Sequence, residues 1–351
     1  MGKIARKFMR IVQLSPSILP ILEAMMRVRR PSITEIARIA GVSSATVSRA
    51  IAKLISEGLP LRGLVDYGAV GLGQAIHIFS TLESDEFPRP DLLRWSFEGA
   101  IPPIAIANTL LPRGFEEQVI KEIESSFPAC ETFRVIRWLP PRHRLRKWFW
   151  PAEATFFIKW DEVINEANVV VEEPREQVIL RYDPLDPLIL YVLEKRPFAK
   201  GVEIRDILLR DYGIKVRYQR VLAHLRKRIF KSGGFGGAAL AATPLDIERS
   251  FTAVLILKGS GAVKLATAMQ THPYFHEAYV GERVGRPGDR RVIIRSHIPI
   301  TELNNLVRFL ISAGEIGYLS KWRIVIGSRA GEKTGSPMIN KIVGVSGEGP
   351  Y

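Results

Sequence analysis

The chain has 351 residues, a formal net charge of +14 and a pI near 10.0. Its hydrophobic fraction of 46% excludes an intrinsically disordered chain, and its length suits two to four compact units. The excess of basic residues predicts attraction to polyanions, with nucleic acid as the first candidate and an anionic membrane surface as the second. The alternative is a solvated basic surface that has no particular partner.

Cysteine content and hydropathy restrict the compartment and the kind of site. Cys130 is the only cysteine, which excludes an intrachain disulfide and a cysteine-based zinc site. Pro16 and Pro20 interrupt the basic and then apolar N-terminal stretch, and no apolar run approaches the ~20 residues of a membrane span. We therefore expect a cytoplasmic protein with no membrane association and without a metal or other cofactor.

A helix-turn-helix motif is predicted in "SITEIARIAGVSSATVSRAIAKLISEG", residues 32–58. Ser32 and Glu35 have the spacing of a capping box, in which each residue would bond the backbone of the other. Gly41 suits the turn, and Ser43 can cap the second helix. The buried stripe of that helix is predicted at Val47, Ile51 and Leu54.

Short hydroxyl and basic side chains are expected on the outward face of this second helix. Such groups at the start of a helix suit contacts with phosphates and base edges in a DNA major groove. The alternative is a helical hairpin with a solvated polar face. We predict base reading by Ser44, Thr46, Ser48 and Arg49 and phosphate contact by Lys53, with Ser43 also in the DNA-binding set.

The order of predicted elements occurs twice along the chain. In each half, helices precede a β-α-β-β-α-β order, which is ferredoxin-like, so we expect an α+β fold. "RPDLLRWSF" is interpreted as a short helix, and "GLPLRGLVDYGAVGLG" and "KSGGFGGAALAATP" as links. The predicted units are a helix-turn-helix domain (1–63), a ferredoxin-like domain (64–140), a basic and aromatic linker or insertion (141–182), a degenerate helix-turn-helix domain (183–243), a second ferredoxin-like domain (244–328) and a flexible tail (329–351).

Three stretches resemble the leucine-responsive regulator (Lrp/AsnC) family of transcription factors. They are "PSITEIARIAGVSSATVSRAIAKLISEGL", "DYGAVGLGQAIHIFSTLE" and "AMQTHPYFHEAYVGERVGRPGDRRVII". That family joins a winged helix-turn-helix to a ferredoxin-like domain for effector binding and oligomerisation. The resemblance implies a sequence-specific DNA-binding regulator that is not an enzyme, with double-stranded DNA as partner. It also implies an intrachain pseudo-dimer, able to form a homodimer or a larger homo-oligomer.

Two departures from the family concern its binding sites. The resemblance places an amino-acid effector near Gly288 and Asp289, but Arg290 and Arg291 follow where the family usually has an aromatic residue and Asp. The second helix-turn-helix carries cations in place of Ser and Thr, which indicates phosphate binding rather than base reading. A purely structural unit is the alternative. The predicted cations are Arg217, Arg220, Arg226 and Lys227, with Arg228 beside them.

Two further features leave alternatives open. "RVIRWLPPRHRLRKWFW" mixes basic and aromatic residues, which suits either nucleic-acid contact or an interface between the two halves. Siroheme decarboxylases resemble the same regulator family, pair two such units, and use His and Arg around an anionic tetrapyrrole. That resemblance implies such roles for His272, His276 and Arg286, and an enzyme of this kind is the alternative function. Pro273 and the lack of a third ligand argue against a metal site at the two histidines.

Overall fold

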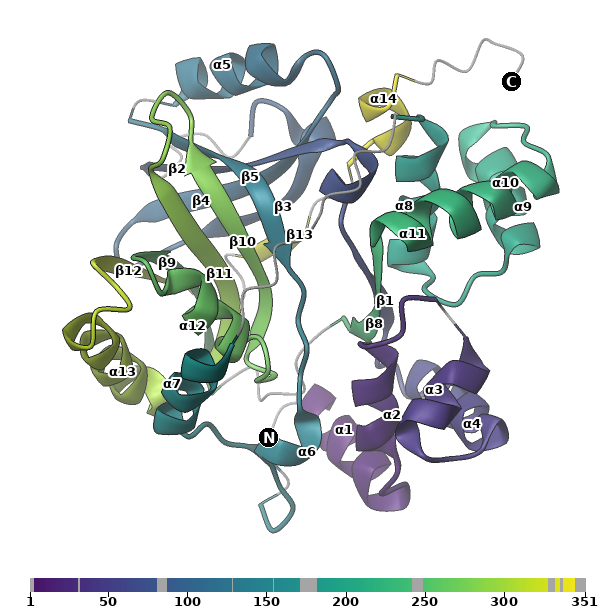
Figure 1. Ribbon diagram of the computed structural model, residues 1–351, viewed down its shortest axis with the longest axis horizontal. Coiled ribbons are helices and arrows are strands. Elements are labelled where there is room, and N and C mark those ends of the chain that lie inside the picture. The colour runs from purple at the N-terminus through teal and green to yellow at the C-terminus, as the bar shows by residue number, and fades with distance from the viewer. Residues whose placement is uncertain are drawn as a thin grey trace.

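The computed structural model describes residues 3–30, 32–80, 87–127, 129–153, 155–170, 182–241, 249–327, 332–334 and 337–344. Two helical units lie on the same side of a large curved sheet (Figure 1). The first helical unit comprises α1 (Lys3–Leu14), α2 (Ile18–Met25), α3 (Ile33–Ala40) and α4 (Ser44–Ser56). The second comprises α8 (Leu185–Lys195), α9 (Gly201–Tyr212), α10 (Tyr218–His224), the π-helical turn η3 (Leu225–Ile229) and α11 (Phe230–Ser232).

One nine-stranded antiparallel sheet contains the strands of both ferredoxin-like units, in the order β12-β9-β11-β10-β5-β2-β4-β3-β13. The first unit supplies β2 (Gly73–Ser80), β3 (Leu93–Glu98), β4 (Ile104–Leu111) and β5 (Glu131–Leu139). The second supplies β9 (Ser250–Lys258), β10 (Phe275–Arg283), β11 (Arg290–Pro299) and β12 (Lys321–Gly327). The ninth strand, β13 (Glu332–Thr334), comes from the C-terminal stretch. Within each unit the order is the ferredoxin-like one, so the α+β fold class is confirmed.

The sheets of the two ferredoxin-like units are joined at two edges, by extended strand pairing at one edge and by a single β-bridge at the other. Strands β5 and β10 pair along their length, with Trp138 opposite Tyr279. At the other end, Ile101 in the β3–β4 connection forms a single bridge to Ile326 of β12. The sheet therefore closes on itself around an interior that includes Trp95, Phe97 and Phe133, all at most 2% exposed.

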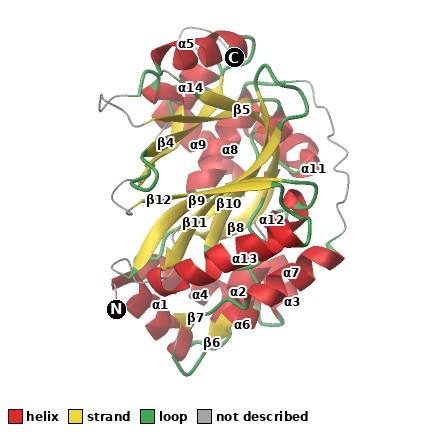
Figure 2. Cartoon of the chain, turned by 90° about the vertical axis from the view of Figure 1, so that its left-hand side faces the viewer, coloured by secondary structure: helices red, strands yellow, loops and turns green. Residues whose placement is uncertain are grey.

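Helices cover the outer face of the closed sheet. Helix α5 (Glu116–Ser126) covers the first unit, and α12 (Ala262–Met269), α13 (Leu303–Glu315) and α7 (Trp160–Val169) cover the second, as Figure 2 shows. The described residues between β2 and β3 contain only the 3-10 turn η2 (Pro90–Leu92). The first helix of the β-α-β-β-α-β order is thus not present in the described part of the first unit.

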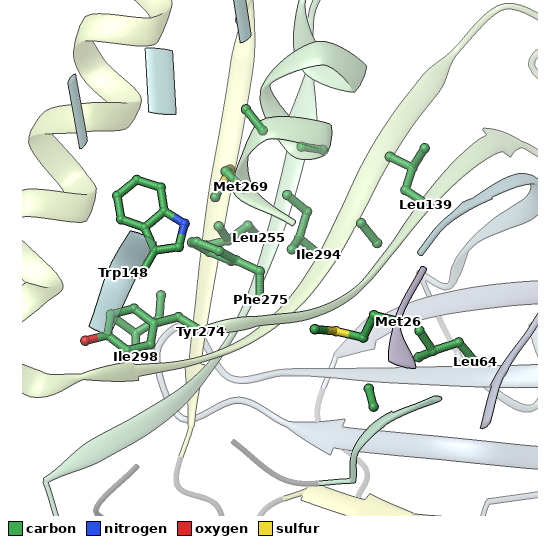
Figure 3. Packing of buried hydrophobic residues seen from close by; sticks show 14 of the residues in the cluster. Met26, Leu64, Leu139, Trp148, Leu255, Met269, Tyr274, Phe275, Ile294 and Ile298 are labelled. Carbon is green, nitrogen blue, oxygen red and sulfur yellow. The ribbon is translucent and has the colours of Figure 1, made fainter. Parts of the chain in front are cut away.

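A two-stranded sheet of β1 (Leu61–Val65) and β8 (Phe235–Leu240) connects the two helical units crosswise. Strand β1 follows the first helical unit but packs on α8 of the second, and β8 packs on α2 of the first. Glycines permit this approach: a Cβ atom at Gly63 would lie 2.3 Å from the carbonyl oxygen of Leu193, and one at Gly237 2.4 Å from that of Met25. The buried cluster in Figure 3 extends from Met26 beside this joint to Phe275 of β10.

Several predicted elements are corrected. "RPDLLRWSF" forms η2 and strand β3 rather than a helix, and the two glycine-rich links contain β1 and β8. The stretch 141–182 contains α6 (Leu145–Trp148), the hairpin β6 (Phe149–Trp150) and β7 (Thr155–Phe156), and α7, with Trp148 fully buried. The predicted tail includes β13 (Glu332–Thr334), which pairs with β3, and α14 (Ile339–Ile342), where Ile339 and Ile342 are buried. The remainder of the tail lies outside the described residues.

Candidate DNA-binding helix and basic cleft

The turn between α3 and α4 has the capping geometry of a helix-turn-helix. The Ser32 Oγ accepts a hydrogen bond from the Glu35 backbone N–H at 3.3 Å, while the Ser32 N–H donates to the Arg30 carbonyl rather than to Glu35. Only one half of the predicted capping box is therefore formed. Gly41 has a φ of 70°, and the Ser43 Oγ accepts from the Thr46 N–H at 3.1 Å.

The outward face of α4 is not covered by the rest of the described chain. Val47, Ile51 and Leu54 are buried as predicted, whereas Ser44, Ser48 and Arg49 are exposed and Lys53 is half-buried. The hydroxyls of Ser43 and Thr46 lie 2.9 Å apart and are occupied by the helix cap. Ser44 and Ser48 form no side-chain hydrogen bond within the described residues, so their hydroxyls can contact a partner.

The second helical unit presents a different surface. Arg217, Arg220, Arg226 and Lys227 are exposed, and the π-helical turn η3 interrupts the helix that corresponds to α4. A π-helical turn shifts the side chains that follow it relative to an α-helix. Arg228 faces inward instead, where its Nε donates to the buried carboxylate of Asp186 at 2.6 Å.

The predicted effector residues lie in an exposed turn between β10 and β11. Gly288 has a φ of 82°, which suits this turn. The Asp289 carboxylate pairs with Lys258 at 2.9 Å and also with Arg291. Asp289 is thus engaged by two cations of its own chain.

The residues considered for tetrapyrrole chemistry are not brought together. Arg286 follows the C-terminal end of β10, whereas His272 and His276 lie at its N-terminal end. The His272 Nε2 lies 2.9 Å from the Phe157 carbonyl, and burial lowers the pKa of His272 to about 3. His276 lies 2.9 Å from His297, and burial lowers its pKa as well. No group of three potential metal ligands occurs among the described residues.

A buried charged network, not predicted from the sequence, links the closed sheet to both helical units. The Glu277 carboxylate of β10 pairs with Arg62 of β1 at 2.8 Å and accepts a hydrogen bond from the Tyr279 hydroxyl at 2.9 Å. Nearby, Arg94 of β3 pairs with Glu194 of α8 at 2.6 Å. Although burial alone would raise the pKa of Glu277, Arg62 and the neighbouring guanidinium groups lower it to about 2.

A basic cleft of about 860 Å³ lies where the two helical units meet the second ferredoxin-like unit. Its cations come from three separate segments: Arg27 and Arg29 after α2, Arg142 and Arg144 before α6, and Lys231 in α11. Trp138 and Phe235 provide aromatic walls, and Glu166 is the one acidic residue of the described lining. The cleft is of a size that accommodates a small ligand.

The basic and aromatic stretch 134–150 is partly internal. Trp138 and Trp148 are buried, and Arg146 pairs with the buried Glu23 of α2 at 3.0 Å, which fixes this stretch to the first helical unit. Arg142 and Arg144 remain exposed at the cleft. The stretch therefore forms an interface within the chain and also contributes part of the basic cleft.

Comparison with known proteins identifies one domain and one shared fold. Residues 18–59 match the IclR helix-turn-helix domain, which confirms an N-terminal helix-turn-helix. The solved structure of the siroheme decarboxylase NirDL aligns with 93% of this chain and 97% of its own, at a TM-score of 0.52 and 11% identity. The same enzyme in complex with an iron-uroporphyrin III analogue aligns with 92% of this chain and 93% of its own, at a TM-score of 0.50 and 13% identity. No curated protein matches the sequence.

These comparisons correct one prediction and refine others. The prediction that the chain is not an enzyme is contradicted, because the structures that share its fold across both halves are those of an enzyme. The helix-turn-helix matches the IclR type, and neither comparison names the predicted Lrp/AsnC family. None of the described helices is both long and apolar enough to cross a membrane.

Proposed function

We propose that the protein is a sequence-specific DNA-binding regulator that reads base edges with α4. The observation that carries the proposal is the uncovered outward face of α4, where Ser44, Ser48 and Arg49 are exposed on a helix whose opposite face is buried. A helix of this kind fits the major groove of B-DNA, where short hydroxyls and Arg can bond base edges. Ser43 and Thr46 would support this face through the helix cap.

The second helical unit would bind the phosphate backbone. Its exposed cations, Arg217, Arg220, Arg226 and Lys227, supply charge without a continuous α-helical reading face, because η3 interrupts the helix. One chain would thus present two unequal DNA-binding units, one that selects sequence and one that adds affinity. The net charge of +14 supports a strongly salt-dependent association.

The test is an electrophoretic mobility shift with a duplex that the wild-type protein has selected from a random library. Arg49→Ala should weaken binding to this duplex by about 10- to 100-fold, because one good base contact contributes about 1–3 kcal/mol. Arg308→Ala is the matched control, since Arg308 is exposed on α13, on the other side of the sheet from α4 (Figure 1). Equal binding by both variants would refute the role of α4.

A siroheme decarboxylase-like enzyme is the second candidate. The observation that favours it is the shared fold, which extends over both halves of the chain rather than over one domain. A protein of this kind should change the absorbance spectrum of siroheme on mixing. It should also release carbon dioxide from the carboxylate side chains of siroheme. An unchanged spectrum at micromolar protein would remove this candidate without affecting the DNA-binding proposal.

A further inference from the structure

We propose that the N-terminal helix α1 binds the phosphate backbone of the DNA next to the bases that α4 reads. This contact rests on the proposed DNA-binding function and extends it to a helix that precedes the matched helix-turn-helix, residues 18–59. The support comes from the fixed position of α1, from the charge of its exposed face and from its place beside the C-terminal end of α4.

The apolar face of α1 is buried against the rest of the chain. Phe8 is 2% exposed, and Ile11 is fully buried. The ring of Phe8 lies 6.5 Å from that of Phe149 and 5.8 Å from that of Phe156, on the two strands of the β6–β7 hairpin. A helix that binds a membrane surface inserts its apolar face into the bilayer. Because this face of α1 is already covered, the helix offers a partner only its polar face.

The exposed face of α1 carries cations that the chain hardly neutralises. These cations are Arg6, Lys7 and Arg10, and the helix contains no acidic residue. Arg6 and Lys7 have no carboxylate partner in the described part of the chain. Arg10 pairs with Glu57 at 3.8 Å but remains 70% exposed, and exposed pairs of this kind are weak. A fixed row of positive charge is complementary to a polyanion such as DNA.

The cations of α1 continue a row of charged residues on α4. Arg49, Lys53 and Glu57 follow one another at intervals of four residues, so they lie along one side of α4 and its C-terminal cap. Arg10 meets this row at Glu57, and the Lys7 ammonium group would lie 3.3 Å from a Cβ atom on the glycine that follows Glu57. Figure 2 shows α1 and α4 next to each other. The exposed face of α1 is therefore continuous with the predicted DNA contacts at Arg49 and Lys53.

The length of α4 places α1 beside the major groove rather than inside it. A helix of 13 residues extends about 20 Å, whereas the major groove of B-DNA is about 12 Å wide. When the N-terminal residues of α4 contact bases, its C-terminal end and α1 lie over the phosphates that flank the groove. Guanidinium and ammonium groups bind these phosphates without reading sequence. Helix α1 thus adds affinity to DNA binding rather than specificity.

The triple variant Arg6→Gln/Lys7→Gln/Arg10→Gln tests this contact by fluorescence anisotropy over a salt series with the selected duplex. The slope of log affinity against log salt should fall by up to about 2.7, because each lost phosphate contact lowers it by about 0.9. The affinity ratio between the selected and a random duplex should not change. The conservative variant Arg6→Lys/Lys7→Arg/Arg10→Lys keeps the charge and should keep the slope.

A control with the same loss of charge separates a local contact from the effect of net charge. Arg308→Gln/Lys321→Gln/Arg323→Gln removes exposed cations of α13 and β12, on the other side of the sheet from α1 (Figure 1). This variant should keep the wild-type slope. Equal slopes in the α1 variant and in the control would overturn the proposal.

Shortened duplexes locate the contact on the DNA. Removing the base pairs that flank the selected motif on one side should weaken binding by the wild-type protein more than binding by the α1 variant. Equal weakening would exclude the α1 contact and leave base reading by α4 intact, whereas a wild-type protein that selects no duplex would remove both. Sedimentation with vesicles that contain phosphatidylserine tests a membrane as the partner. Vesicle binding that is lost in the α1 variant but kept in the control would also overturn the proposal.

Discussion

Gly63 of β1 lies so close to Leu193 of α8 that a Cβ atom on Gly63 would be 2.3 Å from the Leu193 carbonyl oxygen. This approach makes β1, which follows the first helical unit, part of the surface on which the second helical unit packs. The two helical units are therefore held together by backbone contact as well as by side chains.

Replacing Gly63 by Ala should destabilise this joint. The added methyl group would meet backbone atoms that can move only with the helix, so we expect a loss of about 1–3 kcal/mol in the free energy of unfolding. Gly314→Ala in α13 is the control, because a Cβ there would lie 3.8 Å from the Leu319 carbonyl oxygen, an ordinary contact distance. The control should stabilise the protein by up to about 1 kcal/mol. Urea denaturation of both variants measures their free energies of unfolding. Equal values would refute the tight contact.

The charged network at Glu277 should be important for stability. Glu277→Ala removes the carboxylate that pairs with Arg62 and accepts from the Tyr279 hydroxyl, and so leaves the half-buried Arg62 guanidinium without this partner. We expect a loss of about 3–5 kcal/mol in urea denaturation at pH 7. Glu117→Ala breaks the exposed pair with Arg134 and should cost at most about 1 kcal/mol. If the two variants were equally stable, the network would not join the units as described.

The same carboxylate predicts a dependence of stability on acid pH. The pKa of Glu277 is lowered to about 2 in the folded protein from an ordinary value of 4.5, so its contribution is complete above about pH 4.5. That contribution is lost as the pH falls from 4.5 towards 2. Between pH 4.5 and 3, stability should therefore fall less steeply in Glu277→Ala than in the wild-type protein. Parallel curves of unfolding free energy against pH would contradict this.

Buried histidines predict a second pH dependence at higher pH. Burial lowers the pKa of His77 and His272 to about 3 and that of His143 to about 4. Below pH 6.5 the unfolded chain binds protons that the folded protein does not, so stability falls as the pH drops from 6.5 towards 4. Each histidine should contribute a slope of up to about 1.4 kcal/mol per pH unit. Urea denaturation between pH 7 and 5 measures this slope, and constant stability would contradict neutral buried histidines.

The second helical unit should affect the strength of DNA binding more than its sequence preference. Arg217→Ala and Lys227→Ala should each lower the slope of log affinity against log salt by about 0.9, because each would release one fewer counterion. The ratio of the affinity for the selected duplex to the affinity for random duplex should stay constant. Fluorescence anisotropy over a salt series measures both quantities, and a changed ratio would show that this unit reads bases.

Local patterns in the sequence predicted the parts of the fold that local interactions determine. The caps at Ser32 and Ser43 and the buried stripe of α4 follow from hydrogen bonding and periodicity within a few residues. Strand β8 was missed because its sequence, "FGGAAL", is rich in Gly and Ala and depends on pairing with β1, which lies at Leu61–Val65, far earlier in the chain. The closure at Ile101 and Ile326, the network at Glu277 and the basic cleft likewise depend on distant segments.

Selection of binding sites from a random duplex library measures directly whether α4 reads DNA sequence. Selection would be run in parallel with the wild-type protein and with the double variant Ser44→Ala/Ser48→Ala, which keeps the buried face of α4 intact. The wild-type protein should enrich one motif and bind it at least about 10³-fold more tightly than random duplex. The variant should enrich a weaker or different motif. Absence of enrichment by the wild-type protein, or the same motif from both proteins, would show that the outward face of α4 does not read DNA sequence.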